Sequence, residues 1–256
     1  MRLHELQIKN FRKLKNCHIK FRDTTFLIGP NNAGKSSVFS ALEHFHKNSN
    51  LDREDYSKEY NEEENSYTYE EDVEIIAEYH NLPNEANSWL GFKGRVLSSQ
   101  DQLEGETGNS IVYKKVWSLN QTKPKIFMKE YPRTRSTMYA DCKKVSDLVG
   151  EHYSEVFLKD HFGDANFEKN LTTAATKPKL LDLPECWDVQ VDEEPTWVEN
   201  PGGIPGNVLS KLPIIVIIPA ESCISELTSS GGALFNLLGG LFDTVRSNSK
   251  NYAQAQ

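Results

Sequence analysis

Gly29-Pro30-Asn31-Asn32-Ala33-Gly34-Lys35-Ser36 is the stretch that decides how this 256-residue sequence is interpreted. It matches the pattern G-x-x-x-x-G-K-[ST] at every fixed position. The run Thr24 to Ile28 before it is largely apolar and predicts a short strand. After it, apolar residues recur at helical spacing from Val38 to Phe45. A loop of this pattern between a strand and a helix is typical of phosphate binding, whereas a glycine-rich turn without a ligand is the alternative.

Each fixed position of the stretch has a physical role in holding phosphate. Gly29 and Gly34 allow tight turns that present backbone N–H groups to phosphate oxygens, and the helix that follows adds its positive end. Lys35 is expected to reach the β- and γ-phosphates, and the Ser36 hydroxyl is expected to ligate Mg²⁺. The sequence therefore predicts ATP and Mg²⁺ as ligands. The predicted nucleotide contacts are Gly29, Pro30, Asn31, Asn32, Ala33, Gly34, Lys35, Ser36 and Ser37.

The rest of the chain is expected to complete an α/β protein around this loop. Residues 1–46 predict a strand, phosphate loop and helix, and residues 47–72 form an acidic segment that is expected to be a loop. Strand-like runs at Val73–Tyr79, Ile111–Leu119 and Lys125–Tyr131 predict an antiparallel meander over residues 73–131. Residues 132–212 predict a helical and irregular excursion. Residues 213–256 predict a core strand at Ile214–Ile218 and the beginning of a helix, so that all 256 residues form the N-terminal part of one domain.

Charge is distributed unevenly along a chain with a net charge of −8. Residues 1–50 hold nine Lys or Arg against three acids, and residues 51–80 hold twelve acids against two bases. The basic N-terminal residues either contact nucleic-acid phosphates or are solvated residues along strand edges. They are Arg2, Lys9, Arg12, Lys13, Lys15, Lys20 and Arg22.

Composition narrows the cellular setting that we expect. No apolar run approaches the about 18 residues that a membrane helix needs. Four scattered cysteines, without a C-x-x-C pair, predict reduced thiols rather than disulfides or a zinc site. His44 and His46 are two residues apart on the predicted helix and face different directions, so we expect surface histidines and no shared metal. These features favour a cytoplasmic protein.

The opening of the sequence resembles RecF, SMC and Rad50-type ATPases, through Leu3–Phe11, Arg12-Lys13-Leu14 and the phosphate loop. It is more similar to the OLD-family ATPase-nucleases, which include Gabija and retron-associated defence effectors. In that family an acidic segment and a strand like Val73–Tyr79 follow the helix, and a later strand ends as Ile218-Pro219-Ala220-Glu221 does here. The resemblance implies an ABC/SMC-type P-loop fold, with Asn10 and Arg12 beside the nucleotide.

The groups that would activate water for hydrolysis are not identifiable in the sequence. Ile214–Ile218 is not followed by the acidic pair of a Walker B strand, so it predicts a core strand, with Glu221 as the candidate catalytic residue. Ser229-Ser230-Gly231-Gly232 is similar to an ABC signature loop, but a helix-entry turn is the favoured interpretation. We therefore expect slow hydrolysis by this segment alone, and faster hydrolysis with a second copy or a further part.

Three functions remain open at this point. The first is the ATPase module of an OLD-like antiviral effector, in which the nucleotide state controls assembly and a nuclease activity outside this segment. The second is a RecF- or SMC-like ATPase of DNA maintenance, and the third is an interaction platform that binds ATP without hydrolysing it. The first two imply at least a homodimer with nucleotide near the interface and nucleic acid as a partner of the full assembly, away from any membrane.

Overall fold

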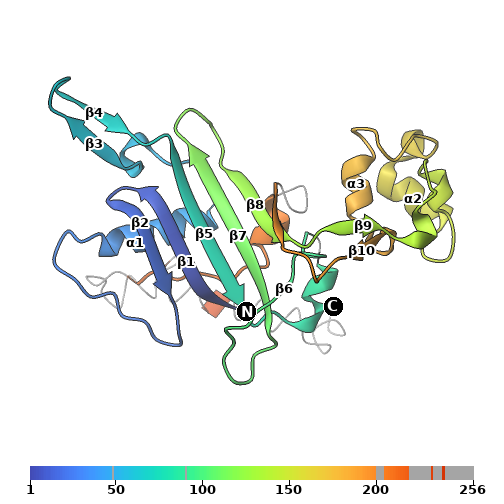
Figure 1. The fold of residues 1–256 in the computed structure, drawn as a ribbon, viewed down its shortest axis with the longest axis horizontal. Helices are drawn as coiled ribbons and strands as arrows, with labels where there is room; N and C mark the ends of the chain where they lie inside the picture. The colour runs from blue at the N-terminus through green and yellow to red at the C-terminus, as the bar shows by residue number, and fades with distance from the viewer. Residues whose placement is uncertain (48, 90, 200–204, 219–231, 233–237, 240–256) are drawn as a thin grey trace. The chain divides into compact units, whose positions relative to one another are not determined.

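The computed structural model describes residues 1–47, 49–89, 91–199, 205–218, 232 and 238–239. The chain divides into two units, Met1–Pro213 and Ile214–Gln256, which are considered separately. The first unit is a mixed α/β structure built on one antiparallel sheet (Figure 1). Among the described residues, no helix combines the length and apolar character that crossing a membrane requires.

Seven strands form the main sheet, in the order β11-β8-β7-β5-β1-β2 with β6 paired to β7. Every pairing in it is antiparallel. The strands are β1 (Arg2–Phe11), β2 (Leu14–Lys20), β5 (Asp72–His80), β6 (Leu97–Ser98), β7 (Asn109–Ser118), β8 (Lys125–Glu130) and β11 (Thr196–Glu199). The meander expected from three apolar runs is therefore present as β5, β7 and β8. It is continuous with the N-terminal strands rather than set beside them, because β5 pairs directly with β1.

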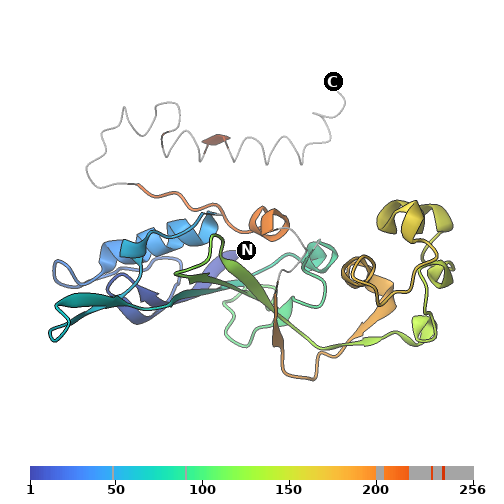
Figure 2. The same ribbon diagram turned by 90° about the horizontal axis from the view of Figure 1, so that it is seen from above.

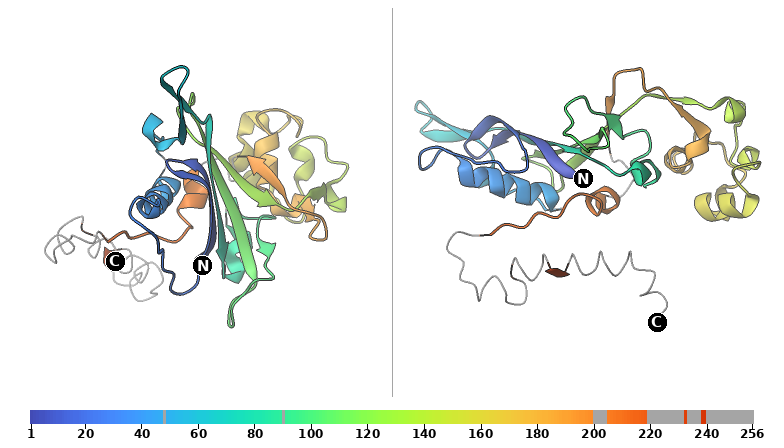
Figure 3. Two further views of the ribbon diagram at one scale, coloured as in Figure 1. Left: turned by 60° about the vertical axis from the view of Figure 1, so that its left-hand side comes forward. Right: turned by 90° about the horizontal axis from the view of Figure 1, so that it is seen from below.

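Side chains alternate between the two faces of this sheet, as period-two strands require. The buried set includes Leu6 and Ile8 of β1 and Ile75 and Ala77 of β5, all fully buried. Helix α1 (Lys35–His46) lies along that face (Figures 2 and 3) and buries the four apolar residues that the sequence spacing predicted, namely Val38, Ala41, Leu42 and Phe45. Helix and sheet thus share one core, and the sequence correctly placed the helix.

The C-terminal end of α1 is held by side chains from the sheet. The Lys115 Nζ donates a hydrogen bond to the Lys47 carbonyl at 2.8 Å, and the Trp117 Nε1 donates one to the Ser49 carbonyl at 3.0 Å. His46 lies 3.0 Å from the Tyr79 hydroxyl, and burial lowers its pKa. The expectation of a surface histidine was therefore wrong for His46, because the helix turns its last residue toward β5.

The acidic segment 47–72 is more ordered than the predicted loop. A short 3-10 helix, η1 (Arg53–Asp55), precedes a hairpin of β3 (Lys58–Asn61) and β4 (Ser66–Tyr69). The acids at the hairpin surface are solvated, as expected, but Asp55 and Tyr56 are buried. The loop expectation was wrong because aromatic and basic side chains alternate with the acids and pack across the hairpin, as Lys58 does over the Tyr67 ring.

A small lobe with its own core follows the meander. It contains β9 (Arg133–Arg135) paired with β10 (Trp187–Val189), and the helices α2 (Glu155–Phe162) and α3 (Lys177–Leu181). Its single-turn 3-10 helices are η3 (Thr137–Tyr139), η4 (Ser146–Leu148), η5 (Asp164–Asn166) and η6 (Pro184–Cys186). Two further short helices lie outside it, η2 (Asn84–Ser88) and α4 (Pro205–Leu209). The predicted excursion over residues 132–212 is thus partly helical, but it also contains β11, which returns to the main sheet beside β8.

Two apolar runs predicted as strands are not strands in the structure. The run Thr24–Ile28 leads into the phosphate loop as extended chain, with Phe26 80% and Ile28 93% exposed. The run Ile214–Ile218, predicted as a buried core strand, is likewise not paired, and Ile214 is 73% exposed. A strand exists only where a neighbour accepts its hydrogen bonds, and no described strand pairs with either run. Of the tail helix predicted after Ile218, the structure describes only residues 238–239.

Candidate functional site: a phosphate cradle at the start of α1

Two residues of the phosphate loop adopt backbone angles in the left-handed region. Gly34 has φ +92° and precedes the first helical residue, and Asn32 has φ +70°. A Cβ built on Gly34 would lie 2.8 Å from Cδ2 of Leu14, which is buried beneath it. Glycine is therefore favoured at position 34 both by its backbone angle and by the close approach of the buried Leu14 side chain.

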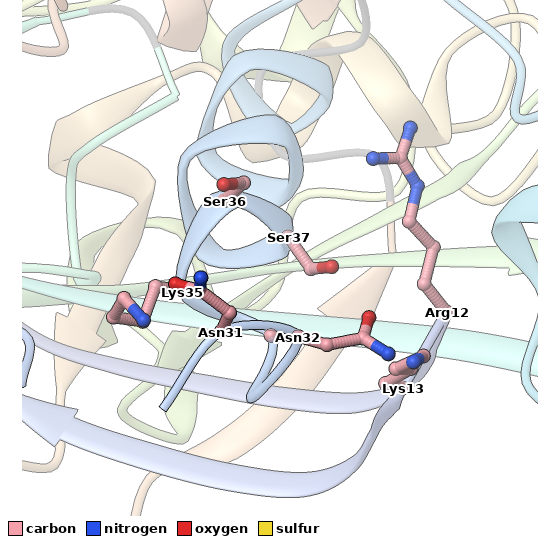
Figure 4. Close-up of a pocket in the computed structure, with 8 residues that line it drawn as sticks. Arg12, Lys13, Asn31, Asn32, Lys35, Ser36 and Ser37 are labelled. Carbon is pink, nitrogen blue, oxygen red and sulfur yellow. The ribbon is translucent and has the colours of Figure 1, made fainter. Parts of the chain in front are cut away.

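The first turn of α1 is arranged to receive an anion. Gly34 provides no capping side chain, and the turn contains no acidic residue. The first N–H groups of a helix have no partner within it, and its N-terminus carries partial positive charge. Lys35 stays at the loop, where its Nζ donates hydrogen bonds to the Gly29 and Pro30 carbonyls at 2.8 and 2.7 Å. The Ser36 and Ser37 hydroxyls flank the same turn (Figure 4).

These groups line a pocket of about 440 Å³. Its residues are Arg12, Lys13, Asn31, Asn32, Gly34, Lys35, Ser36 and Ser37. Three cations and a helix N-terminus suit a polyphosphate, and a serine hydroxyl on the first turn suits a hard cation bound to it. The residues present therefore fit ATP with Mg²⁺. We call residues 29–37 the phosphate cradle.

Arg12 is held at the mouth of the cradle by the segment after α1. It has φ +51°, an unfavourable angle for a residue with a Cβ. Its N–H donates to the Asp55 carbonyl at 2.7 Å, its Nε to the Asp55 Oδ1 at 2.8 Å, and its carbonyl accepts from the Ser57 hydroxyl at 2.6 Å. Figure 4 shows Arg12 extending from the turn between β1 and β2, with Lys13 next to it near Asn32. The strained turn is thus fixed by contacts with η1 and its neighbours.

The other predicted site residues are divided between the cradle and its surroundings. Asn10 does not line the pocket; its amide donates to the Asp72 carbonyl at 3.1 Å, and it therefore braces β1 against β5. Gly29, Pro30 and Ala33 form the outer loop, where two of their carbonyls accept from Lys35. Glu221 and residues 229–231 of the signature-like stretch lie outside the described residues.

The basic N-terminal residues are mostly neutralised by carboxylates. Six of the seven form ion pairs: Arg2 with Glu106, Lys9 with Glu74, Arg12 with Asp55, Lys15 with Glu59, and both Lys20 and Arg22 with Asp101. Lys13 is the exception within the described part of the chain, and it lines the cradle pocket. Sequence reasoning had grouped Lys13 with the basic face and missed its position. The sequence feature that could have revealed this position is that Lys13 follows Arg12 directly. Both residues lie in the two-residue turn between the paired residues Phe11 and Leu14.

In a comparison with protein families, residues 1–187 match the AAA ATPase domain. The matched range includes the cradle, α1 and every strand of the main sheet except β11. The chain belongs to this family. It is an AAA-type P-loop ATPase domain. No curated protein matches the sequence. Among solved structures, the domain is similar to one from work on ATP-driven dimerization and DNA-stimulated activation of SMC ATPases, at 14% identity and a TM-score of 0.33, over 50% of this chain and 69% of the other.

Proposed function

We propose that this ATPase domain binds ATP with Mg²⁺ in the phosphate cradle and hydrolyses it when a second protein surface covers the γ-phosphate. The proposal rests mainly on the geometry observed at the start of α1. Gly34 fits closely over Leu14, and the turn that follows it places Lys35 and Ser36 at one pocket without an acidic residue.

The role that we propose for each residue follows from its position. The loop and helix N–H groups bind phosphate oxygens, and Lys35, released from the Gly29 and Pro30 carbonyls, neutralises β- and γ-phosphate charge. The Ser36 hydroxyl holds Mg²⁺, which supplies further charge neutralisation when bound. Arg12 and Lys13 face the same phosphates from the β1–β2 turn. Together these groups stabilise charge that develops during phosphoryl transfer.

Exposure of the cradle supports a requirement for a second surface. Asn31, Asn32 and Ser36 are exposed, and so are Phe26 and Ile28 on the chain leading into the loop. A phosphate bound there is open to water on its outer side, whereas efficient transfer needs that side closed and a water molecule positioned. We therefore propose an assembly of at least two chains with nucleotide at the interface, and Glu221 as the first candidate for the water-activating acid.

The resemblance of residues 1–46 to the OLD family supports a finer proposal. In it, the nucleotide state of this domain controls assembly of an antiviral effector whose DNA- or RNA-cleaving activity lies in another domain or subunit. A RecF- or SMC-like role in DNA maintenance is the alternative, favoured by the similarity of the same residues to those ATPases. Turnover measured against chain concentration tests the assembly: brisk hydrolysis that does not depend on concentration contradicts it.

The nucleotide site is tested by calorimetry with Mg²⁺-ATP. Lys35→Ala should weaken binding by roughly 100-fold, because it removes a charge-assisted contact to the phosphates. Lys47→Ala is the matched control, since Lys47 lies at the other end of α1 and its ammonium group pairs with Glu43 at the surface. Ser36→Ala should reduce the gain from Mg²⁺ more than binding measured in EDTA. Equal affinity of wild type and Lys35→Ala would disprove the nucleotide site.

A further inference from the structure

A second pocket adjoins the phosphate cradle on the other side of the β1–β2 turn. It has a volume of about 520 Å³ and lies between that turn and the β3–β4 hairpin. Its lining residues are Arg12, Lys13, Lys15, Glu54, Tyr56, Lys58 and Tyr67. Arg12 and Lys13 therefore line both pockets, and the second pocket, which we call the hairpin pocket, begins where the cradle ends.

The hairpin pocket differs from the cradle in chemistry. Its lining is mainly carbon, from two tyrosine rings and the methylene stems of three lysines, whereas amide, hydroxyl and cationic groups make up a larger share of the cradle lining. Tyr56 is buried, and its backbone forms an isolated β-bridge with Phe11, so Tyr56 forms a rigid wall of the hairpin pocket. Tyr67 is 54% exposed, which leaves part of its surface open to a ligand. Flat apolar contact with polar groups at the edge is what a nucleobase requires.

The charges around the hairpin pocket are nearly all satisfied by the protein. Lys58 pairs with Glu54 at 2.5 Å, Lys15 pairs with Glu59, and Arg12 pairs with Asp55. The pocket is consequently a poor site for a second polyphosphate. Lys13, in contrast, has no ion pair or hydrogen bond in the described part of the chain, and it lies at the boundary of the two pockets.

We propose that the hairpin pocket is the nucleoside subsite of the cradle. The base of the nucleotide lies against Tyr67 and the Lys58 stem, and Lys13 contacts the chain of phosphates where it leaves the nucleoside. This assignment rests on the proposed function, because it needs the polyphosphate in the cradle. The β3–β4 hairpin thereby becomes part of the binding site, although it lies more than twenty residues after the phosphate loop.

The test compares Mg²⁺-ATP with inorganic tripolyphosphate, which lacks a nucleoside, by calorimetry on the whole chain. Tyr67→Ala should weaken ATP binding about tenfold, the loss expected for one base–aromatic contact. Tripolyphosphate binding should stay within about twofold of wild type, since its contacts lie in the cradle. Tyr67→Phe keeps the ring and should bind both ligands as wild type does. Trp197→Ala is the control, because Trp197 also lies under lysines but on β11.

The outcomes separate the subsite from the cradle. If Tyr67→Ala binds ATP as wild type does, or loses ATP and tripolyphosphate equally, the nucleoside subsite is wrong while the cradle stands. If Lys35→Ala leaves both ligands unaffected, the cradle itself is wrong. Photolabelling of the unaltered chain with 8-azido-ATP gives an independent reading: the label should fall on residues 54–69, and a label confined to other segments would overturn the assignment.

Discussion

The two ends of α1 differ in almost every physical respect. At its C-terminal end, Phe45 is fully buried, and its ring packs edge-on against Tyr113 with 5.4 Å between the ring centres. The Lys115 and Trp117 side chains donate hydrogen bonds to carbonyls that follow the helix. At its N-terminal end, Ser36 is exposed and no side chain caps the helix. One end is satisfied by the protein, and the other retains N–H groups that only water or a ligand can satisfy.

This difference shows how a rigid element can present a binding site. The sheet holds the helix by the end far from the phosphate cradle, so the cradle does not need to contribute to stability. Conversely, residues at the buried end should affect folding, and residues at the exposed end should affect binding. Each prediction below tests that separation along α1.

The largest effect is expected from Phe45→Ala. Removing a fully buried ring from the core between α1 and β7 should lower the free energy of unfolding by about 3–5 kcal/mol. Phe39→Ala, on the same helix but 49% exposed, should cost less than about 1 kcal/mol. Urea denaturation of the two variants measures the difference. Equal losses would mean that α1 is not anchored at its C-terminal end.

Gly34→Ala should affect both folding and binding, because position 34 joins the cradle to the core. A methyl group there would approach Leu14 to 2.8 Å at a backbone angle unfavourable for alanine. We expect a loss of about 1–3 kcal/mol in stability and the loss of ATP binding.

Gly105→Ala is the matched control for Gly34→Ala. Gly105 also has a positive φ, +84°, but a Cβ there meets nothing within 4 Å. It should cost about 1 kcal/mol from backbone strain alone and leave calorimetric ATP binding intact. If both glycine variants bind ATP equally well, the close packing of Leu14 beneath the cradle does not position the loop.

The smallest effect is the pH dependence contributed by Lys115. Burial lowers the pKa of Lys115 from its ordinary value of 10.5 to about 8, and no carboxylate among the described residues forms an ion pair with it. Between these values the unfolded chain binds more protons than the folded one, so this residue makes stability rise with pH across that window. Below about pH 8 both states are protonated, and the cost of the buried charge is present in full.

Lys115→Met should abolish this part of the pH dependence. The difference in unfolding free energy between wild type and variant, measured by urea denaturation at several pH values from 7 to 10.5, should change by about 1 kcal/mol or more in favour of wild type. Calorimetric ATP affinity at pH 7 should remain within about threefold of wild type, because Lys115 holds the opposite end of the helix. A pH-independent difference would show that Lys115 is not a buried cation.

The sequence by itself determined the elements whose signals are local. The phosphate loop, the helix after it and the strands β5, β7 and β8 follow from residue spacing within short windows. A helix satisfies its own backbone, so the period of Val38, Ala41, Leu42 and Phe45 was sufficient to place α1 and its buried side. Gly34 and Lys35 were equally predictable, because the loop chemistry fixes their order and spacing.

Only the tertiary structure decided what depends on distant partners. Lysine is usually a surface residue, yet Lys115 is buried. Its ammonium group donates a hydrogen bond to the carbonyl of Lys47, just after the end of α1. Asp55 lies in a run of solvated acids, yet it forms an ion pair with Arg12, which is 43 residues away in the sequence. The run Thr24–Ile28 has the composition of a strand but no described partner. Hydrogen bonds between strands and ion pairs between loops join residues far apart in sequence, and local spacing carries no record of them.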